Sequence, residues 1–386
     1  MMLTPYSANE LFNWLRQKED FLLLDVRNEE DFGRFQVESP YQVDMLNVPY
    51  FDFMEEEEAS VAKVPRNKKI KVVCAKEGSA QYVGEILESH GFDDVGYLME
   101  GIVSWGNMLA PVRVNDEGEA FEVWQFIRPG KASLSWGVIS EGELSIFDPS
   151  RNLEFYTEFA AEHGCKITQT FETHLQADYI SGSRFISKAA GSKVFGHSGD
   201  FMGASFDYTA VQNGDIFKAS RKGPDIEVVH SPGHTPGSTC YKIDDTYVVS
   251  GDTIFLVSLG RPDLGGKAVE WAGMLYETMT KKIKTMDPTL QILPGHYIEW
   301  AEADVDLIFM DTLQNILESN SAIYGISSEV DFVEFIKQNI RKQPDVYAEI
   351  RKVNAGWLDP EDDEQSSMDL GKNECAASAY AAQQSA

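Results

Sequence analysis

The stretch ETHLQADYISG at residues 172–182 contains the first of four short motifs that decide the fold of most of this chain. Each motif places a histidine or an aspartate where an apolar segment ends, beside glycine or proline. A lone histidine in such a place is more often a hydrogen-bonded structural residue than a ligand. Four in series indicate a site, because loops at strand ends are where a scaffold presents ligands. The four residues are His174, His234 in HSPGHTPGS (230–238), Asp252 in GDT (251–253) and His296 in LPGH (293–296).

These motifs resemble those of the metallo-β-lactamase superfamily over residues 120–358, with support from Asp148-Pro149 and from NGD at 213–215. The resemblance implies an αββα sandwich. In this superfamily the first motif is usually His-x-His-x-Asp-His, which supplies ligands for two metal ions. Here Gln176 and Tyr179 stand at the second and third histidine positions. An amide is a poor zinc ligand and a neutral phenol a worse one, so the second metal site is expected to be lost.

The remaining residues, His174, His234 and Asp252, form the set of two histidines and one carboxylate that is typical of non-haem Fe(II) oxygenases. In these residues and in GRPD at 260–263 the chain resembles the persulfide dioxygenases. That resemblance implies one Fe(II) held by the three side chains, with Zn as the alternative metal. It also implies that Arg261 supports a glutathione pocket, and that Asp178 and His296 contact the metal-binding side chains without binding the metal themselves.

The other histidines have no motif assigned to them. We interpret His230 as a packing residue, and His90, His163 and His197 as solvated surface residues. Tyr297 directly follows His296, whereas the persulfide dioxygenases tend to place a tyrosine two residues after that histidine.

The first part of the chain alternates short apolar runs with amphipathic stretches, which predicts a parallel sheet flanked by helices. Cys74 ends the apolar run 70–74, and the loop that follows leads directly into a predicted helix. Unpaired backbone N–H groups and the helix dipole in such a loop favour the thiolate, which is the nucleophile. The alternative is a buried, inert cysteine at a strand end.

A further set of residues resembles the rhodanese family over the first 112 residues: DVR at 25–27, Cys74 with its loop, EGI at 100–102, and Trp105. The resemblance implies that Cys74 carries a persulfide as the catalytic residue, and that Asp25 and Arg27 form a structural ion pair. Many rhodaneses place an arginine that binds thiosulfate where this chain has Ser79. The arginine that would bind thiosulfate is thus replaced in this chain. Thiosulfate and sulfite are possible partners of this domain, and sulfur transfer from a persulfide does not require them.

These observations divide the chain into a rhodanese-like domain at 1–112, a linker at 113–119, a metallo-β-lactamase-fold domain at 120–358, and a tail at 359–386. The tail is acidic at first and then rich in small residues, so part of it is expected to be flexible. It contains Cys375, which is either a sulfur acceptor for Cys74 or an idle thiol. A homodimer is possible, and the sequence does not decide it.

Composition narrows the class of protein further. The net charge of −29 opposes binding to nucleic acid and to anionic membranes. No apolar run is long enough to span a bilayer, and the first residues do not resemble a secretory signal. Four widely spaced cysteines do not suggest a disulfide framework, so we expect a cytoplasmic location.

The leading hypothesis is an enzyme that oxidises glutathione persulfide, or another low-molecular-weight persulfide, to sulfite with O₂ and also transfers sulfane sulfur at Cys74. One alternative is a zinc-dependent thioester hydrolase of the glyoxalase II type. The other is a non-enzymatic persulfide carrier in which only Cys74 matters.

Overall fold

The computed structural model describes residues 3–263, 266–340 and 342–373, which divide into two compact units. The first unit comprises residues up to 110 with the short pieces 128–131 and 370–372, and the second comprises the remainder. Each unit is described by itself. Among the described helices, none combines the length and apolar character that crossing a lipid bilayer requires.

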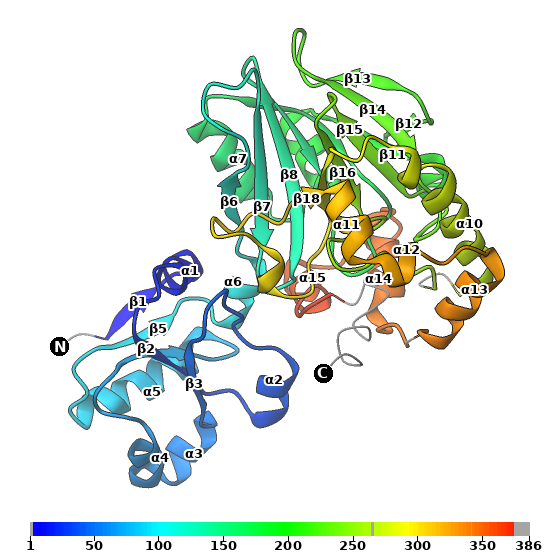
Figure 1. Ribbon diagram of the computed structural model, residues 1–386. Helices are drawn as coiled ribbons and strands as arrows, with labels where there is room; N and C mark the ends of the chain where they lie inside the picture. Colours follow the sequence, from blue (N-terminus) through cyan, green and yellow to red (C-terminus); the bar gives the residue numbers. More distant parts are fainter. Residues whose placement is uncertain (1–2, 264–265, 341, 374–386) are drawn as a thin grey trace. The chain divides into compact units, whose positions relative to one another are not determined.

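The first unit is built on a five-stranded sheet in the order β1-β5-β4-β2-β3, and every described pairing in it is parallel (Figure 1). Its strands are β1 (Thr4–Tyr6), β2 (Phe21–Asp25), β3 (Asp44–Asn47), β4 (Lys69–Val73) and β5 (Val95–Leu98). Its helices are α1 (Ala8–Arg16), α2 (Glu29–Arg34), α3 (Tyr50–Glu55), α4 (Glu57–Lys63), α5 (Glu77–Ser89) and α6 (Ile102–Asn107).

Local sequence explains these elements. Ser7 caps α1 and forms a capping box with Glu10, which satisfies backbone N–H groups that the first helical turn leaves unpaired. All of β2 is buried, as expected for a central strand of a sheet covered on both faces. The parallel sheet predicted for this domain is confirmed. Asp25 and Arg27 form the expected buried ion pair, with Nη2 2.6 Å from Oδ2.

The second unit contains two sheets. The seven-stranded sheet has the order β12-β11-β10-β9-β8-β7-β6, and the six-stranded sheet runs from β13 to β18 in sequence order. The strands of the first are β6 (Ala110–Arg113), β7 (Glu122–Arg128), β8 (Ser133–Ser140), β9 (Glu143–Phe147), β10 (Lys166–Phe171), β11 (Lys193–His197) and β12 (Thr209–Val211). Those of the second are β13 (Ile216–Lys218), β14 (Asp225–His230), β15 (Thr239–Ile243), β16 (Tyr247–Gly251), β17 (Gln291–Pro294) and β18 (Asp311–Thr312).

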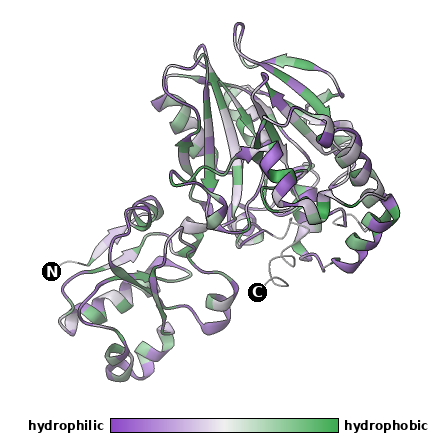
Figure 2. Cartoon of the chain, viewed as in Figure 1, coloured by the Kyte–Doolittle hydropathy of each residue, from purple (hydrophilic) through white to green (hydrophobic). Residues whose placement is uncertain are grey.

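Helices lie on the outer sides of the two sheets (Figure 1). Hydrophobic residues recur along the strands, whereas hydrophilic ones are frequent on outer helices such as α13 (Figure 2). The helices are α7 (Leu153–Glu162), α8 (Ser183–Ala190), α9 (Ser198–Phe201), α10 (Ala268–Lys281), α11 (Leu313–Ser319), α12 (Ser321–Tyr324), α13 (Glu329–Gln338), α14 (Val346–Asn354) and α15 (Asp362–Met368), with 3₁₀ turns at Ile283–Thr285 and Trp300–Glu302. The αββα sandwich predicted for this domain is confirmed.

Aromatic rings fill the space between the sheets and fix the position of β10. Phe171, the last residue of β10, stacks on Phe147 and Phe195 from the neighbouring strands, with ring centroids 5.0 and 4.6 Å away. It also meets Tyr241 of the opposite sheet at 5.1 Å. Because His174 follows only three residues later, this packed core fixes where its loop begins.

The first part of the tail contains a helix. The acidic run at 361–364 enters helix α15, which is held to the domain by Arg151. The guanidinium of Arg151 lies 2.7 Å from Asp362 and donates to Ser366 at 2.6 Å. Asp369, just after the helix, is buried. Cys375 lies outside the described residues.

Candidate metal centre

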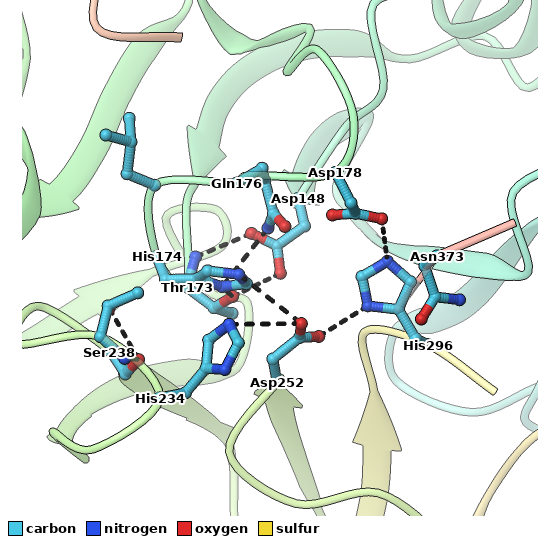
Figure 3. A network of polar contacts seen from close by, with 12 residues as sticks. Asp148, Thr173, His174, Gln176, Asp178, His234, Ser238, Asp252, His296 and Asn373 are labelled. Carbon is cyan, nitrogen blue, oxygen red and sulfur yellow. Dashed lines mark hydrogen bonds and ion pairs between the residues drawn. The ribbon is translucent and has the colours of Figure 1, made fainter. Parts of the chain in front are cut away.

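Three loops of the second unit bring His174, His234 and Asp252 together (Figure 3). His174 follows β10, His234 lies between β14 and β15, and Asp252 directly follows β16. One potential ligand atom from each residue lies within 4.8 Å of the others. Asp252 Oδ2 is 3.8 Å from Nε2 of His174 and 3.5 Å from Nε2 of His234. All three residues are buried, with at most 2% of their surface exposed.

The hydrogen bonds behind the two histidines determine which ring nitrogen carries the proton. Nδ1 of His234 lies 2.9 Å from the carbonyl oxygen of Arg261, which can only accept, so Nδ1 carries the proton. Nδ1 of His174 lies 2.9 Å from Thr173 Oγ1, and that hydroxyl donates its own proton to Asp148 Oδ2 at 2.7 Å. Nδ1 of His174 must therefore donate too. Both rings thus present the lone pair of Nε2 towards Asp252.

The charges of these groups fit a divalent cation. Burial lowers the pKa of His174 to about 3, so the ring is neutral at physiological pH. Burial opposes ionisation of Asp252, but the neighbouring His296, His174 and His234 outweigh it and hold the pKa of the carboxyl below its usual value. The centre therefore offers a neutral imidazole from His174 and a carboxylate from Asp252, beside the imidazole of His234.

Two atoms of the centre test whether a metal fits. Among the described residues, neither His174 Nε2 nor Asp252 Oδ2 has a hydrogen-bond partner, although both are buried. An unsatisfied buried polar group is costly, and a charged one more so. A cation bound between these atoms and His234 would satisfy both of them. Imidazole and carboxylate donors suit iron and zinc alike, so the donor set does not choose between these metals.

His296 lies on the far side of Asp252 (Figure 3). Its Nδ1 is 2.7 Å from Asp252 Oδ1, and its Nε2 is 3.0 Å from Asp178 Oδ2. Burial alone would lower the pKa of His296, but the two carboxylates outweigh it and raise the pKa to about 10. A protonated imidazole has no lone pair for a metal. Asp178 and His296 are thus placed to support Asp252, as the resemblance implied.

Gln176 and Tyr179, which replace two histidines of the superfamily motif, do not face the centre. The amide nitrogen of Gln176 lies 3.4 Å from Nδ1 of His174, on the edge of the ring opposite Nε2. The hydroxyl of Tyr179 donates to the carbonyl of Asp148 at 3.2 Å. Neither side chain replaces the metal ligand that the superfamily motif has at its position.

Arg261 lies close to the centre and is held by Asp263. Its guanidinium is buried and forms two hydrogen bonds with Asp263, from Nε at 2.7 Å and from Nη2 at 2.6 Å. The chain itself therefore supplies a counter-charge to this cation. The contact of Arg261 with the centre is made by its backbone carbonyl, which orients His234. A direct charge interaction with a substrate carboxylate is not what this geometry favours.

Two residues outside the donor set support His174 and the loop that follows it. Asn354 of α14 donates to the carbonyls of Gln176 and Tyr179 at 2.9 and 2.8 Å and accepts from the N–H of Ser181 at 2.9 Å. Its side chain thereby holds the loop that follows His174. Thr173 could have been noticed only as the neighbour of His174, since nothing in its spacing shows which group its hydroxyl reaches.

In the first unit, Cys74 is buried at the start of the loop between β4 and α5. Burial raises the pKa of its thiol, while the N–H groups of Lys76 and Ala75 and the side chain of Ser79 lower it. Burial outweighs the loop in its effect on this pKa, which agrees with the alternative of a buried cysteine at a strand end. Ser79, which stands where many rhodaneses place an arginine, contacts the sulfur.

One histidine outside the centre differs from the sequence interpretation. His197, expected on the surface, is partly buried and stacks on His230 with ring centroids 3.9 Å apart. Burial, followed by the influence of His230 and Lys282, lowers the pKa of His197 to about 4. Cys165 and Cys240 are buried.

Comparison with known proteins gives matches in both parts of the chain. Residues 7–108 match the rhodanese-like domain family, and residues 128–310 match the metallo-β-lactamase superfamily. A protein named hydroxyacylglutathione hydrolase from Anaeromyxobacter dehalogenans is 27% identical over 169 residues, which are 44% of this chain and 63% of that protein. A protein named persulfide dioxygenase ETHE1, mitochondrial, from Bos taurus is 29% identical over 143 residues, 36% of this chain and 52% of that protein. The chain thus spans less than two thirds of either relative.

Solved structures show the same fold. A metallo-β-lactamase from Staphylococcus aureus superposes with a TM-score of 0.55 at 27% identity, covering 61% of this chain and 73% of that one. ETHE1 from Myxococcus xanthus superposes with a TM-score of 0.53 at 22% identity, covering 60% and 97%. The chain therefore consists of a rhodanese-like domain followed by a metallo-β-lactamase domain that brings two histidines and an aspartate together in its interior.

Proposed function

We propose that this chain oxidises glutathione persulfide, or a related low-molecular-weight persulfide, with O₂ at a single iron held by His174, His234 and Asp252. The observation that carries the proposal is the arrangement of the donors. The imidazoles of His174 and His234 and the carboxylate of Asp252 converge, while His296 is engaged by Asp252 and Asp178. The relative from Bos taurus that bears the name persulfide dioxygenase supports the same reaction class.

The overall reaction balances with one water: RSSH, O₂ and H₂O give RSH, sulfite and two protons. Bound iron would supply a place where the persulfide sulfur and O₂ react within one coordination sphere. The chain's own contribution is to orient the donors. Thr173 and the carbonyl of Arg261 keep the protons of His174 and His234 on Nδ1, and His296 holds Asp252 ionised.

For the rhodanese-like domain we propose that Cys74 transfers sulfane sulfur as a cysteine persulfide. Attack by the Cys74 sulfur on the outer sulfur of a donor persulfide forms one S–S bond and breaks another, releasing the donor thiol. Ser79 and the N–H groups of Ala75 and Lys76 contact the sulfur and support its anionic form. Thiosulfate and sulfite remain candidate partners for this step.

A second candidate function is thioester hydrolysis of the glyoxalase II type with zinc, which the relatives named hydroxyacylglutathione hydrolase favour. It predicts zinc in the protein and turnover of lactoylglutathione. Three side chains oppose it, because the amide of Gln176 and the neutral phenol of Tyr179 are poor zinc ligands, and protonated His296 has no lone pair for a second ion. A non-enzymatic carrier predicts a Cys74 persulfide and no bound metal.

The deciding experiment measures oxygen uptake by iron-loaded protein with glutathione persulfide and sulfite formation in the same sample. We expect uptake in the wild type, its loss in His234→Ala, and its persistence in Cys74→Ser, which leaves the metal donors intact. The persulfide dioxygenase proposal fails if iron-loaded protein takes up no oxygen, or if His234→Ala retains the activity. Turnover of lactoylglutathione by the zinc form would favour the hydrolase instead.

A further inference from the structure

Asp200 connects the two histidine loops of the metal centre. It lies on the short helix α9, in a segment remote in sequence from both loops, and is partly buried. Its Oδ2 accepts from the N–H of Leu175 at 3.0 Å and from the hydroxyl of Thr235 at 2.6 Å. Its Oδ1 accepts from the N–H of Gly237 at 2.7 Å. Leu175 directly follows His174, and Thr235 directly follows His234, so one carboxylate holds the chain next to both imidazoles.

The loops are packed closely around this carboxylate. A β-carbon added to Gly237 would lie 2.5 Å from Cγ of Asp200 and 2.6 Å from its backbone nitrogen, which is closer than atoms can approach. Glycine at 237 is therefore what lets the His234 loop reach Asp200. The contact also requires a carboxylate at position 200, because the three groups that contact its two oxygens are all hydrogen-bond donors.

We propose that Asp200 is a positioning residue that sets the separation of His174 and His234 and thereby the affinity of the centre for its metal. This inference rests on the proposed metal site. Two of the donors to Asp200 are backbone N–H groups, which can only donate, and they reach different oxygens. Both oxygens must therefore accept. An asparagine at this position has one oxygen and one NH₂ group, so it must lose one loop or push it away.

The test compares Asp200→Asn with a matched variant, Asp215→Asn. Asp215 also accepts from a backbone N–H, that of Gln212 at 2.8 Å, in an exposed turn, and among the described residues its carboxylate makes no hydrogen bond to the neighbours of His174 or His234. Cobalt(II) is the probe, because its visible absorption reports the geometry of its ligands. For Asp200→Asn we expect the cobalt dissociation constant to rise about 10- to 100-fold, as is typical when the partners of metal ligands are removed. The cobalt bands should also shift, and Asp215→Asn should match the wild type.

A second pair of variants covers the case in which Asp200→Asn does not fold. Thr235→Val removes one of the donors to Asp200, whereas Thr235→Ser keeps the hydroxyl. We expect weaker cobalt binding in the valine variant and recovery in the serine variant. The inference is overturned if Asp200→Asn, or Thr235→Val in its place, binds cobalt with wild-type affinity and spectrum. Failure of the wild type to bind cobalt at all would instead refute the proposed metal site itself.

Discussion

Replacing Thr173 by valine removes a hydroxyl group that is hydrogen-bonded to two buried side chains, those of Asp148 and His174. Thr173 Oγ1 donates to Asp148 Oδ2 at 2.7 Å and accepts from His174 Nδ1 at 2.9 Å, and all three residues are buried. Valine has nearly the same shape as threonine, so the change removes hydrogen bonds with little change in packing. It should reduce both the stability of the domain and the affinity of the centre for its metal.

The size of the stability effect follows from the groups left behind. An unsatisfied buried polar group costs about 1–3 kcal/mol, so two cost about 2–6 kcal/mol. Asp148 keeps the hydrogen bond from the N–H of Thr173 at 2.7 Å, which favours the lower half of this range, about 2–4 kcal/mol. His174 would also lose the bond that fixes its proton on Nδ1, and metal affinity should fall about 10- to 100-fold.

The matched control is Thr170→Val, on strand β10 just before Thr173. Thr170 is fully buried, and its hydroxyl has no hydrogen-bond partner among the residues that the structure describes. Its replacement should leave stability unchanged or raise it, because it removes a polar group that is already unsatisfied. The assay is urea unfolding of both metal-free variants, followed by a metal titration of each. Equal stability and equal metal affinity in the two variants would refute the proposed role of Thr173.

Three other predictions concern separate parts of the chain. Ser79→Ala removes a group that lowers the pKa of Cys74, so the midpoint of a pH profile of thiol alkylation should move to higher pH; a midpoint that stays or falls would contradict the assignment. His197 has a folded pKa of about 4, below its ordinary 6.5, so between these pH values the folded state binds fewer protons than the unfolded state. The stability that this group contributes above pH 6.5 is therefore lost as the pH falls towards 4. His197→Asn keeps an acceptor for the N–H of Gly199, and the metal-free variant should gain stability relative to the wild type over that window; a difference independent of pH would argue against it. Asn354→Ala should lower stability by about 1–3 kcal/mol because it leaves loop groups unsatisfied, and Asn354→Asp should cost more because its oxygens face two carbonyls; unfolding midpoints in the reverse order would be inconsistent with these hydrogen bonds.

The fold and the donors of the centre could be predicted because each depends on local signals. Alternating apolar runs predict strands, and His174, His234 and Asp252 each follow the end of such a run. In a sandwich whose strand ends meet at one edge, residues in those places come together. The loss of two motif histidines at Gln176 and Tyr179 is likewise visible without a structure.

The supporting contacts could not be predicted, because they join segments far apart in sequence. Asp200 reaches the centre from a helix with no motif of its own, and Asn354 hydrogen-bonds to a carbonyl group 178 residues away in sequence. The spacing of Arg261 and Asp263 does not by itself show that the two side chains form a buried ion pair. The burial that raises the pKa of Cys74 is a property of the folded domain, and the composition of its loop gives no measure of it.

The central claim is that one iron is held by His174, His234 and Asp252. The most direct test is the metal content of protein purified without oxygen, measured by mass spectrometry for the wild type and for Asp252→Asn. We predict close to one iron per chain in the wild type and its loss in the variant. Two zinc ions per chain, or iron content that Asp252→Asn does not change, would contradict this account.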